Sequence, residues 1–353
     1  MRKAKSTETD KSTVSVPESV TLGELDLALV NALQLRPRAT WAELADPLGT
    51  TPGTLARRWD RLSRAGLAWV TAAPGKGFTQ NRCTAFVLVQ SQPNYRTEVV
   101  AALAGYAEVV TIQTASGTKD IILDVLTRDL RTLDRFLSDE LNRIAGITAT
   151  SVFLATSMYL ESSRWRLRSL DPGQLTAINP SPSSLSPANP AISLAELDRQ
   201  LLDHLVRDGR RSWMELAQET GSSTATVRRR VNKLVASGIV TFRCEIANSF
   251  AGWPIQASLL AQAAAKDLDS ICRALAGWPE SRLVAAVTGP ANVYLTLWAQ
   301  NLGEVQRLES VISSKMPSLA VVDRTITLNM PKRMGHLCDS EGRRVGVQPI
   351  SPW

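Results

Sequence analysis

The chain is a tandem repeat of one unit, and no other feature of the sequence constrains its fold as strongly. When the sequence is shifted by about 172 residues, its two halves align without a gap. The segment GELDLALVNAL at 23–33 matches AELDRQLLDHL at 195–205. About 17 of roughly 49 positions are identical between 22–70 and 194–242, well above chance for two unrelated helical segments. The sequence therefore predicts two copies of a unit that itself has two parts.

The two copies are separated by a segment with the composition of a linker. Residues 171–192 (DPGQLTAINPSPSSLSPANPAI) are dense in Pro, Ser and Asn and poor in residues that build a core. Both ends of the chain are polar, so we expect tails there. The predicted divisions are a disordered tail (1–20), a first helical domain (21–80), a first domain of strands and helices (83–160), a linker (161–192), a second helical domain (193–247), a second domain of strands and helices (253–330) and a C-terminal tail (331–353).

Each copy begins with a pattern that predicts three helices around a tight turn. The first two helices of each copy start with a Ser/Thr-x-x-Glu capping box, at Thr21, Thr40, Ser193 and Ser212. Gly49 and Gly221 supply the sharp turn before the third helix. The segments 66–78 and 238–246 that follow are expected to form strand–turn–strand wings.

The third helix of each copy is apolar on one side and cationic on the other. In copy one, Leu55, Trp59 and Leu62 lie within roughly 40° of one line, and the arginines lie opposite. Such a helix, preceded by a helix and a turn, suits insertion into the major groove, where guanidinium groups contact guanine edges or phosphates. A solvated surface face is the alternative, and the repetition of the whole motif argues against it. The predicted DNA-binding residues are Thr50, Thr51, Thr54, Arg57, Arg58, Arg61, Arg64, Ser222, Ser223, Thr226, Arg229, Arg230 and Lys233.

The net charge of +7 is concentrated in these helical parts. Each carries about +3, whereas 83–160 carries about −2 and 253–330 about 0. This distribution favours double-stranded DNA as the partner. The chain has neither a membrane-length apolar stretch nor a secretory leader, so we expect a cytoplasmic, nucleoid-associated protein that does not bind membranes.

The scarcity of cysteine and histidine argues against catalysis and metal binding. The four cysteines are scattered without a Cys-x-x-Cys pair, and His204 and His336 are the two histidines. Structural zinc, disulfides and histidine-based catalytic sites are therefore not expected. We predict no metal, no cofactor and no enzymatic activity.

The second part of each copy alternates strands and helices in the order βαββαβ. In copy one the predicted strands are 85–90, 108–114, 121–127 and 148–155, with helices at 96–104 and 130–144; copy two repeats the pattern from 255 to 328. This order is the ferredoxin-like arrangement, an antiparallel sheet with two helices on one face. The predicted fold class is α+β, with two winged helix-turn-helix domains and two ferredoxin-like βαββαβ sandwich domains in tandem.

The combination resembles the leucine-responsive regulator (Lrp/AsnC) family. The residues that carry the resemblance are ELDxxLxxxL in the first helix, W-x-ELA in the second, the Thr- and Arg-rich third helix, and the turn that runs from Gly117 to Asp120. The resemblance covers most of 22–158 and again 194–330. It implies a sequence-specific transcription regulator that responds to an amino acid or related metabolite, with an intrachain pseudo-dimer that assembles into further homo-oligomers.

The resemblance also implies an effector site at the turn between the second and third strands of each sandwich. The matching residues are Gly117, Thr118 and Asp120 in copy one, and Gly289 and Asn292 in copy two. Asp120 offers a carboxylate to an α-ammonium group, whereas Asn292 has no charge to offer. The alternative is a structural turn in which the glycine supplies positive φ and the aspartate caps.

Two other functions are alternatives to the regulator. Some relatives with this architecture resemble siroheme decarboxylases, although both histidines of this chain lie outside the predicted sandwiches. The other alternative is a small-molecule sensor that does not bind DNA. A tetrapyrrole bound to the protein favours the first alternative, and a failure to bind DNA favours the second.

Overall fold

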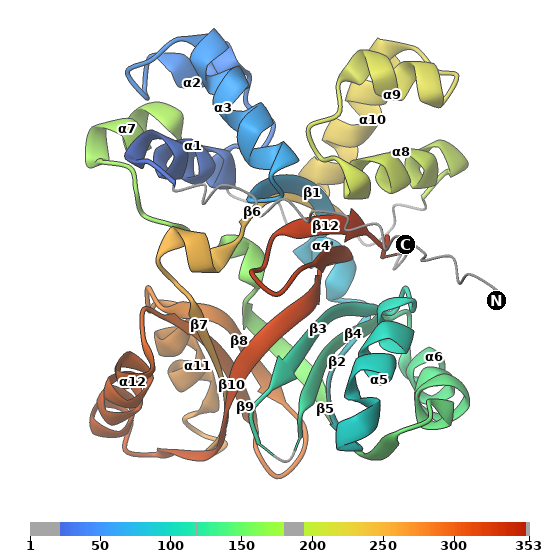
Figure 1. The fold of residues 1–353 in the computed structure, drawn as a ribbon, viewed down its shortest axis with the longest axis vertical. Coiled ribbons are helices and arrows are strands. Elements are labelled where there is room, and N and C mark those ends of the chain that lie inside the picture. The colour runs from blue at the N-terminus through green and yellow to red at the C-terminus, as the bar shows by residue number, and fades with distance from the viewer. Residues whose placement is uncertain (1–21, 118, 180–193, 351–353) are drawn as a thin grey trace, which may run out of the picture.

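The structure is a computed structural model that describes residues 22–117, 119–179 and 194–350 (Figure 1). Two helical domains lie side by side at one end of the molecule, and two sheets with helices on their outer faces lie at the other. The bounds of matching elements differ by the same shift of about 172 residues that relates the two halves of the sequence. The predicted tandem fold is therefore confirmed. The predicted tail at 1–20, Thr118 and residues 180–192 of the predicted linker lie outside the described residues.

The helices follow the predicted order in both copies. Copy one has α1 (Glu24–Leu35), α2 (Trp41–Ala45), α3 (Pro52–Arg64), α4 (Lys76–Thr79), α5 (Arg96–Ala104), α6 (Leu130–Arg135) and, after its last strand, α7 (Pro172–Ile178). Copy two has α8 (Glu196–Arg207), α9 (Trp213–Glu219), α10 (Thr224–Ala236), α11 (Leu268–Ala276) and α12 (Leu302–Lys315). Helix α6 continues as a π-helical turn and a 3-10 turn, η2 (Phe136–Glu140) and η3 (Leu141–Arg143). No helix within the described ranges is long and apolar enough to cross a membrane.

The strands form a closed barrel and a separate two-stranded ribbon. Copy one contributes β1 (Ala68–Pro74), β2 (Cys83–Ser91), β3 (Val109–Ala115), β4 (Ile121–Thr127) and β5 (Ile147–Leu160); copy two contributes β6 (Val240–Ile246), β7 (Ile255–Ala263), β8 (Ser281–Val287), β9 (Val293–Ala299) and β10 (Leu319–Arg333). Within each copy the strand order is ferredoxin-like, β3-β4-β2-β5 and β8-β9-β7-β10. The two sheets join twice, where β5 pairs with β8 and β10 pairs with β3. Eight strands therefore close on themselves and leave no free edge.

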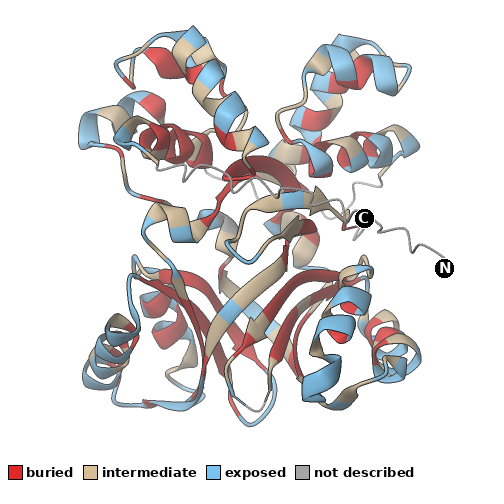
Figure 2. Ribbon diagram, in the orientation of Figure 1, coloured by how far each residue is buried: buried red, intermediate tan, exposed pale blue. Residues whose placement is uncertain are grey.

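Alternation along the strands divides the core into an inner and two outer layers. On β4, Ile121 and Leu123 pack outward against the helices, whereas Ile122 and Asp124 lie on the inner face. One end of the barrel is filled by apolar side chains, among them Phe86 and Tyr294, whose ring centroids lie 4.2 Å apart. The other strands of the barrel are buried along most of their length, whereas β5 and β10 are largely half-buried or exposed (Figure 2). The helices bury the side that faces the sheets.

The capping residues of the helix-turn-helix domains match the prediction only in part. The boxes at Thr40 and Ser212 are present, and each hydroxyl accepts a hydrogen bond from the backbone of the following glutamate. Helices α1 and α8 begin two residues later than predicted, after Gly23 and Ala195. Their caps come from Asp26 and Asp198, whose carboxylates accept the N–H of the capping residue. The predicted caps Thr21 and Ser193 lie outside the described residues.

The predicted strand–turn–strand wings do not form within either copy. Each segment supplies a single strand, and β1 pairs with β6 from the other copy in an antiparallel ribbon beneath the two helical domains (Figure 1). Thr71 and Arg243, which are equivalent positions in the repeat, are partners at the centre of this ribbon. The pseudo-two-fold axis of the molecule therefore passes through this pair. Pairing between the copies satisfies backbone groups that a wing hairpin would have satisfied locally.

The segments expected to be a linker and a tail are folded where the structure describes them. Trp165, Leu167 and Leu170 are buried in the core of the first helical domain, and the backbone N–H of Leu167 donates to Gln34 of α1. At the C-terminus, β11 (His336–Cys338) and β12 (Arg344–Val347) extend the sheet from β10, and Ile350 is buried. Both segments are polar in composition, but each contains a few apolar side chains that are buried in the core and hold the segment in place.

The docked C-terminal segment makes Gly66 sensitive to substitution. Gly66 has φ +68°, and a Cβ at this position would lie 2.3 Å from the carbonyl oxygen of Arg344. Gly49 has φ +60° with no atom near its Cβ position. We expect Gly66→Ala to lower the free energy of unfolding by about 1–3 kcal/mol more than Gly49→Ala, measured by urea denaturation. Equal losses for the two variants would mean that the segment does not dock as described.

Candidate nucleic-acid interface and ligand sites

The predicted recognition helices are α3 and α10, and both present polar faces to solvent away from the barrel. Thr51 and Ser223 cap them, and each hydroxyl accepts the backbone N–H three residues later. Thr51 and Ser223 are exposed, whereas Thr50, Thr54, Ser222 and Thr226 are half-buried. The apolar sides are buried through Leu55 and Leu62 in α3 and through Val227, Val231 and Leu234 in α10. Both helices therefore have the two-sided character that the sequence predicts.

Part of the cationic stripe is engaged inside the helical domain. In copy one, Asp26 is buried and its carboxylate accepts hydrogen bonds from Arg58 at 2.9 Å and Arg61 at 2.6 Å. In copy two, Asp198 is buried in the same way and binds Arg230 through two hydrogen bonds. These arginines fasten the third helix to the first. The aspartate of the ELD pattern was the sequence feature that pointed to this pairing, and the prediction missed it.

Other cations of the two helices remain available to an external partner. Arg57, Arg229 and Lys233 are exposed and have no hydrogen bond or ion pair to any described residue. Arg64 is exposed and pairs with Asp60 one turn earlier. Arg228, which the prediction omitted, is exposed as well. The structure thus separates the predicted set into residues that position the helix and residues that can reach a ligand.

A reciprocal contact joins the two helical domains. Arg38 of copy one lies over the Trp213 ring at 3.8 Å, and Arg210 of copy two lies over the Trp41 ring at 4.0 Å. Each arginine also donates to two backbone carbonyls of the other copy, Arg38 to Gly209 and Arg211, and Arg210 to Pro37 and Ala39. Burial lowers the pKa of both guanidinium groups to about 10. We call this pair of contacts the arginine clasp; it fixes the placement of α3 relative to α10.

The predicted effector turns have matching geometry in the two copies. Gly117 and Gly289 have φ of +100° and +113°, so the glycines serve the turn. The carboxylate of Asp120 accepts the N–H of Ser91 at 2.8 Å and its hydroxyl at 2.6 Å, and Arg96 lies 3.3 Å away. Asn292 makes the equivalent tie, with two hydrogen bonds of 2.8 Å to the backbone of Ala263. Both side chains fasten neighbouring strands, and Thr118 lies outside the described residues.

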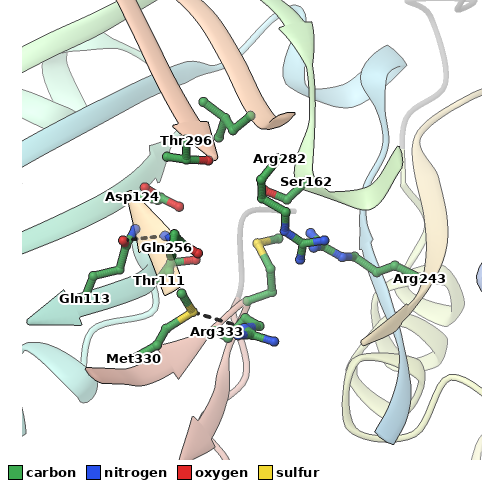
Figure 3. A pocket seen from close by; sticks show the side chains of 12 residues that line it. Thr111, Gln113, Asp124, Ser162, Arg243, Gln256, Arg282, Thr296, Met330 and Arg333 are labelled. Carbon is green, nitrogen blue, oxygen red and sulfur yellow. Dashed lines mark hydrogen bonds between the residues drawn. The ribbon is translucent and has the colours of Figure 1, made fainter. Parts of the chain in front are cut away.

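A polar cavity lies where the barrel meets the ribbon, at the end opposite the apolar core (Figure 3). It has a volume of about 40 Å³. Arg243 and Arg282 lie on one side together with Ser162, and the other side holds the side chains of Asp124, Gln113, Gln256, Thr111 and Thr296. The lining residues are Thr111, Gln113, Asp124, Ser162, Arg243, Gln256, Arg282, Leu283, Thr296, Met330, Arg333 and Met334.

Charges in and behind this cavity perturb one another strongly. Burial alone would raise the pKa of Glu245, but the charges of Arg243, Arg282 and Arg333 outweigh it and hold the pKa at about 2. Burial lowers the pKa of Arg282 to about 9 and raises that of Asp124 to about 6. The prediction missed this site entirely. A comparison of the two copies would have drawn attention to it, because the three arginines occur in copy two only. The equivalent positions in copy one hold Thr71, Val110 and Glu161.

The histidines and cysteines form no cluster of metal ligands. Within the described ranges, no three His, Cys, Asp or Glu side chains gather in a way that would hold a metal ion. His336 is not in a tail but in β11, buried against Trp69 with ring centroids 5.5 Å apart. Burial lowers its pKa to about 3, so the ring is neutral.

Sequence comparison identifies relatives for both parts of the unit. The profile of the Lrp/AsnC ligand binding domain matches residues 84–165, and that of the AsnC-type helix-turn-helix domain matches 22–63 and 194–235. An uncharacterized HTH-type transcriptional regulator of Pyrococcus horikoshii is 31% identical over 148 residues, which are 41% of this chain and 94% of that protein. The regulatory protein AsnC of Escherichia coli is 25% identical over 140 residues, 39% of this chain and 91% of its own length.

A solved structure shares the architecture of the whole chain. The siroheme decarboxylase NirDL, in complex with an iron-uroporphyrin III analogue, superposes with a TM-score of 0.58 over 93% of this chain and 95% of its own. Sequence identity is 11%, so this likeness concerns the fold alone. The arrangement of two helix-turn-helix and two sandwich domains in one chain is therefore not particular to this protein.

Proposed function

The chain belongs to the Lrp/AsnC family of helix-turn-helix regulators, and on this basis we propose that it regulates transcription by binding a specific DNA sequence with both of its recognition helices. The two helical domains take the places that the two subunits of a dimer would take, so one chain binds two half-sites. The proposed site of action is the nucleoid.

The observation that carries this proposal is the pair of recognition helices held in a defined relation by the arginine clasp. Each helix exposes cations that have no partner within the described ranges, namely Arg57 in α3, and Arg229 and Lys233 in α10. The threonines and serines at both helix starts offer hydroxyl and backbone donors to phosphates. A surface of solvated charge would need neither the clasp nor its symmetric counterpart.

We also propose, as the finer part of this function, an amino acid or related metabolite as effector at the turns around Gly117, Thr118 and Asp120 and around Gly289 and Asn292. An ammonium group would replace Arg96 as the cationic partner of Asp120, while Ser91 keeps its hydrogen bonds. The neutral Asn292 makes copy two a weaker candidate. Assembly of several chains would follow through the sandwich domains, as the family resemblance implies.

The test is the binding of the protein to DNA from upstream of its own gene. We expect a retarded complex that a hundredfold excess of mixed-sequence duplex does not displace, because specific sites bind at least about 1000-fold more tightly than others. The logarithm of the affinity should fall linearly with the logarithm of salt concentration, since bound phosphates release counterions. Binding without any sequence preference, or none at all, would refute the proposal and leave the sensor that does not bind DNA.

A second candidate is a siroheme decarboxylase-like enzyme, and the likeness over the whole chain to NirDL is the observation that favours it. The cavity between the copies is small for a tetrapyrrole, and His336 is buried, neutral and outside the residues that line it. Visible absorbance of the purified protein after incubation with iron uroporphyrin would favour this candidate over the regulator.

A further inference from the structure

We propose that the cavity between the barrel and the ribbon binds a small carboxylate that also carries a hydrogen-bond donor, such as a short hydroxy or amino acid. This site is separate from the turns at Gly117 and Gly289, and its occupation does not depend on DNA binding. The mouths of closed barrels are common places for small ligands, since the wall supplies converging side chains.

Three buried guanidinium groups beside this cavity share one carboxylate partner. Arg243, Arg282 and Arg333 are each at least nine-tenths buried, and Glu245 and Asp124 are the carboxylates among them. Glu161 and Arg166 also face Arg243, one of each sign. Each of these three guanidinium groups pairs with the carboxylate of Glu245, and a single carboxylate does not balance three charges. Buried charges are costly unless they are paired, so an anion would stabilise this arrangement.

A hydrogen-bond donor and an acceptor on the cavity wall are free to bind a ligand. Arg333 is occupied, because it donates to the carbonyl oxygen of Ile246 and to Asn248. In contrast, the buried Nε of Arg243 and the buried Oδ1 of Asp124 have no hydrogen-bond partner among the described residues. A donor and an acceptor in one cavity suit a ligand with a carboxylate at one end and a hydroxyl or ammonium group nearby.

The remaining wall of the cavity is held in place by its own hydrogen bonds. Gln256 donates to Gln113 at 2.6 Å and accepts the indole N–H of Trp298 at 2.9 Å, so these amides are fixed. The ring of Trp298 also supports the guanidinium of Arg282 at 4.3 Å. A water needs roughly 10–15 Å³ on the same scale, so the cavity has room for a ligand of only a few non-hydrogen atoms. A preorganised wall of this kind lowers the cost of ordering on binding.

The cations of the cavity belong to one copy only. The cavity lies near the pseudo-two-fold axis, and it is lined by equivalent pairs such as Asp124 with Thr296 and Ser162 with Met334. The positions in copy one that match Arg243, Arg282 and Arg333 hold a threonine, a valine and a glutamate. A scaffold that both copies need would keep the same residues twice. The three arginines occur in copy two alone. This is expected of a binding site, whereas residues that stabilise the fold of both copies would occur in both.

Calorimetry on the full chain tests the proposal with glycolate, glycine, acetate and inorganic phosphate as separate probes. We expect glycolate or glycine to bind, and acetate to bind at least about fivefold more weakly because it offers no donor to Asp124. Arg243→Gln should weaken binding at least about tenfold. Arg135→Gln, an exposed arginine on the outer helix α6, is the matched control and should leave affinity unchanged.

A second variant protects the test against a folding defect. Asp124→Leu keeps the approximate shape of the side chain but removes both acceptor oxygens, and it should bring the affinities for glycolate and acetate close together. The proposal is overturned if no carboxylate binds at millimolar concentration, if phosphate alone binds, or if the Arg243 and Asp124 variants bind as the wild type does. None of these measurements uses DNA. The proposed DNA binding can therefore be refuted without affecting the ligand result, and the ligand proposal can be refuted without affecting DNA binding.

Discussion

Simultaneous replacement of Arg57, Arg229 and Lys233 by alanine should weaken operator binding at least about 100-fold. These exposed cations have no partner among the residues that the structure describes, so their charge is available to phosphates or guanine edges, each contact worth about 1–3 kcal/mol. The dependence of affinity on salt should become less steep by roughly one unit for each phosphate that the variant no longer binds. Stability should change little, because exposed side chains away from ion pairs contribute little to folding. Gel retardation and fluorescence titration at several salt concentrations measure both effects.

The matched control removes the same charge from another surface. Arg131, Arg135 and Lys266 are exposed on the sandwich domains, on α6 and on the loop before α11. Replacement of these three residues changes the net charge equally, so any general effect of charge appears in both variants. If both triple variants bind DNA with the same affinity, the recognition helices do not contact DNA.

In the double variant Arg38→Ala, Arg210→Ala, the two helical domains should no longer be held in a fixed relative orientation. Each arginine donates hydrogen bonds to the opposite copy and stacks on its tryptophan, so we expect a loss of about 2–3 kcal/mol in unfolding free energy per arginine. The larger effect concerns DNA. Wild-type protein should reject operators in which half-sites are moved apart by five base pairs, about half a helical turn. The double variant should lose much of this discrimination, because its recognition helices can rotate relative to one another.

Arg36→Ala is the control for the clasp. Arg36 lies two residues before Arg38, but it pairs at the surface with Glu43 of its own copy. Surface pairs contribute about 0–1 kcal/mol, so its loss should be small and should leave the dependence on half-site spacing intact. A double variant with wild-type spacing dependence would show that the ribbon alone positions the helices.

Much of the fold could be predicted because the patterns that specify it are local. Each helix-turn-helix motif is specified by capping residues, turn glycines and apolar residues at helical spacing, all within about 40 residues of one another. The sandwich strands follow from short apolar runs, and the repeat provides each prediction twice. Bounds differ by a few residues, as at β5, which extends to Leu160 because it pairs with β8 of the other copy.

Contacts between the copies could not be predicted in the same way. The ribbon of β1 and β6, the arginine clasp and the burial of Trp165 all depend on which surfaces meet, and the periodicity of a segment does not contain that information. The same holds for the cationic stripe. Arg57 and Arg61 look alike in the sequence, but Asp26 engages Arg61 and leaves Arg57 free. The aspartate of the ELD pattern indicates that some arginine of the third helix is paired, and the three-dimensional arrangement shows which one.

The union of both recognition helices in one chain has a consequence for the DNA itself. Identical subunits read identical half-sites, so their operators are palindromes. Here α3 carries PGTLARRWDRLSR and α10 carries TATVRRRVNKLVA, which are free to read different bases. From the proposed function we therefore expect an operator with distinguishable left and right halves, on which the bound protein has a direction relative to the start of transcription. Dilution does not separate the two helix-turn-helix domains, because the peptide chain and the closed barrel hold them together.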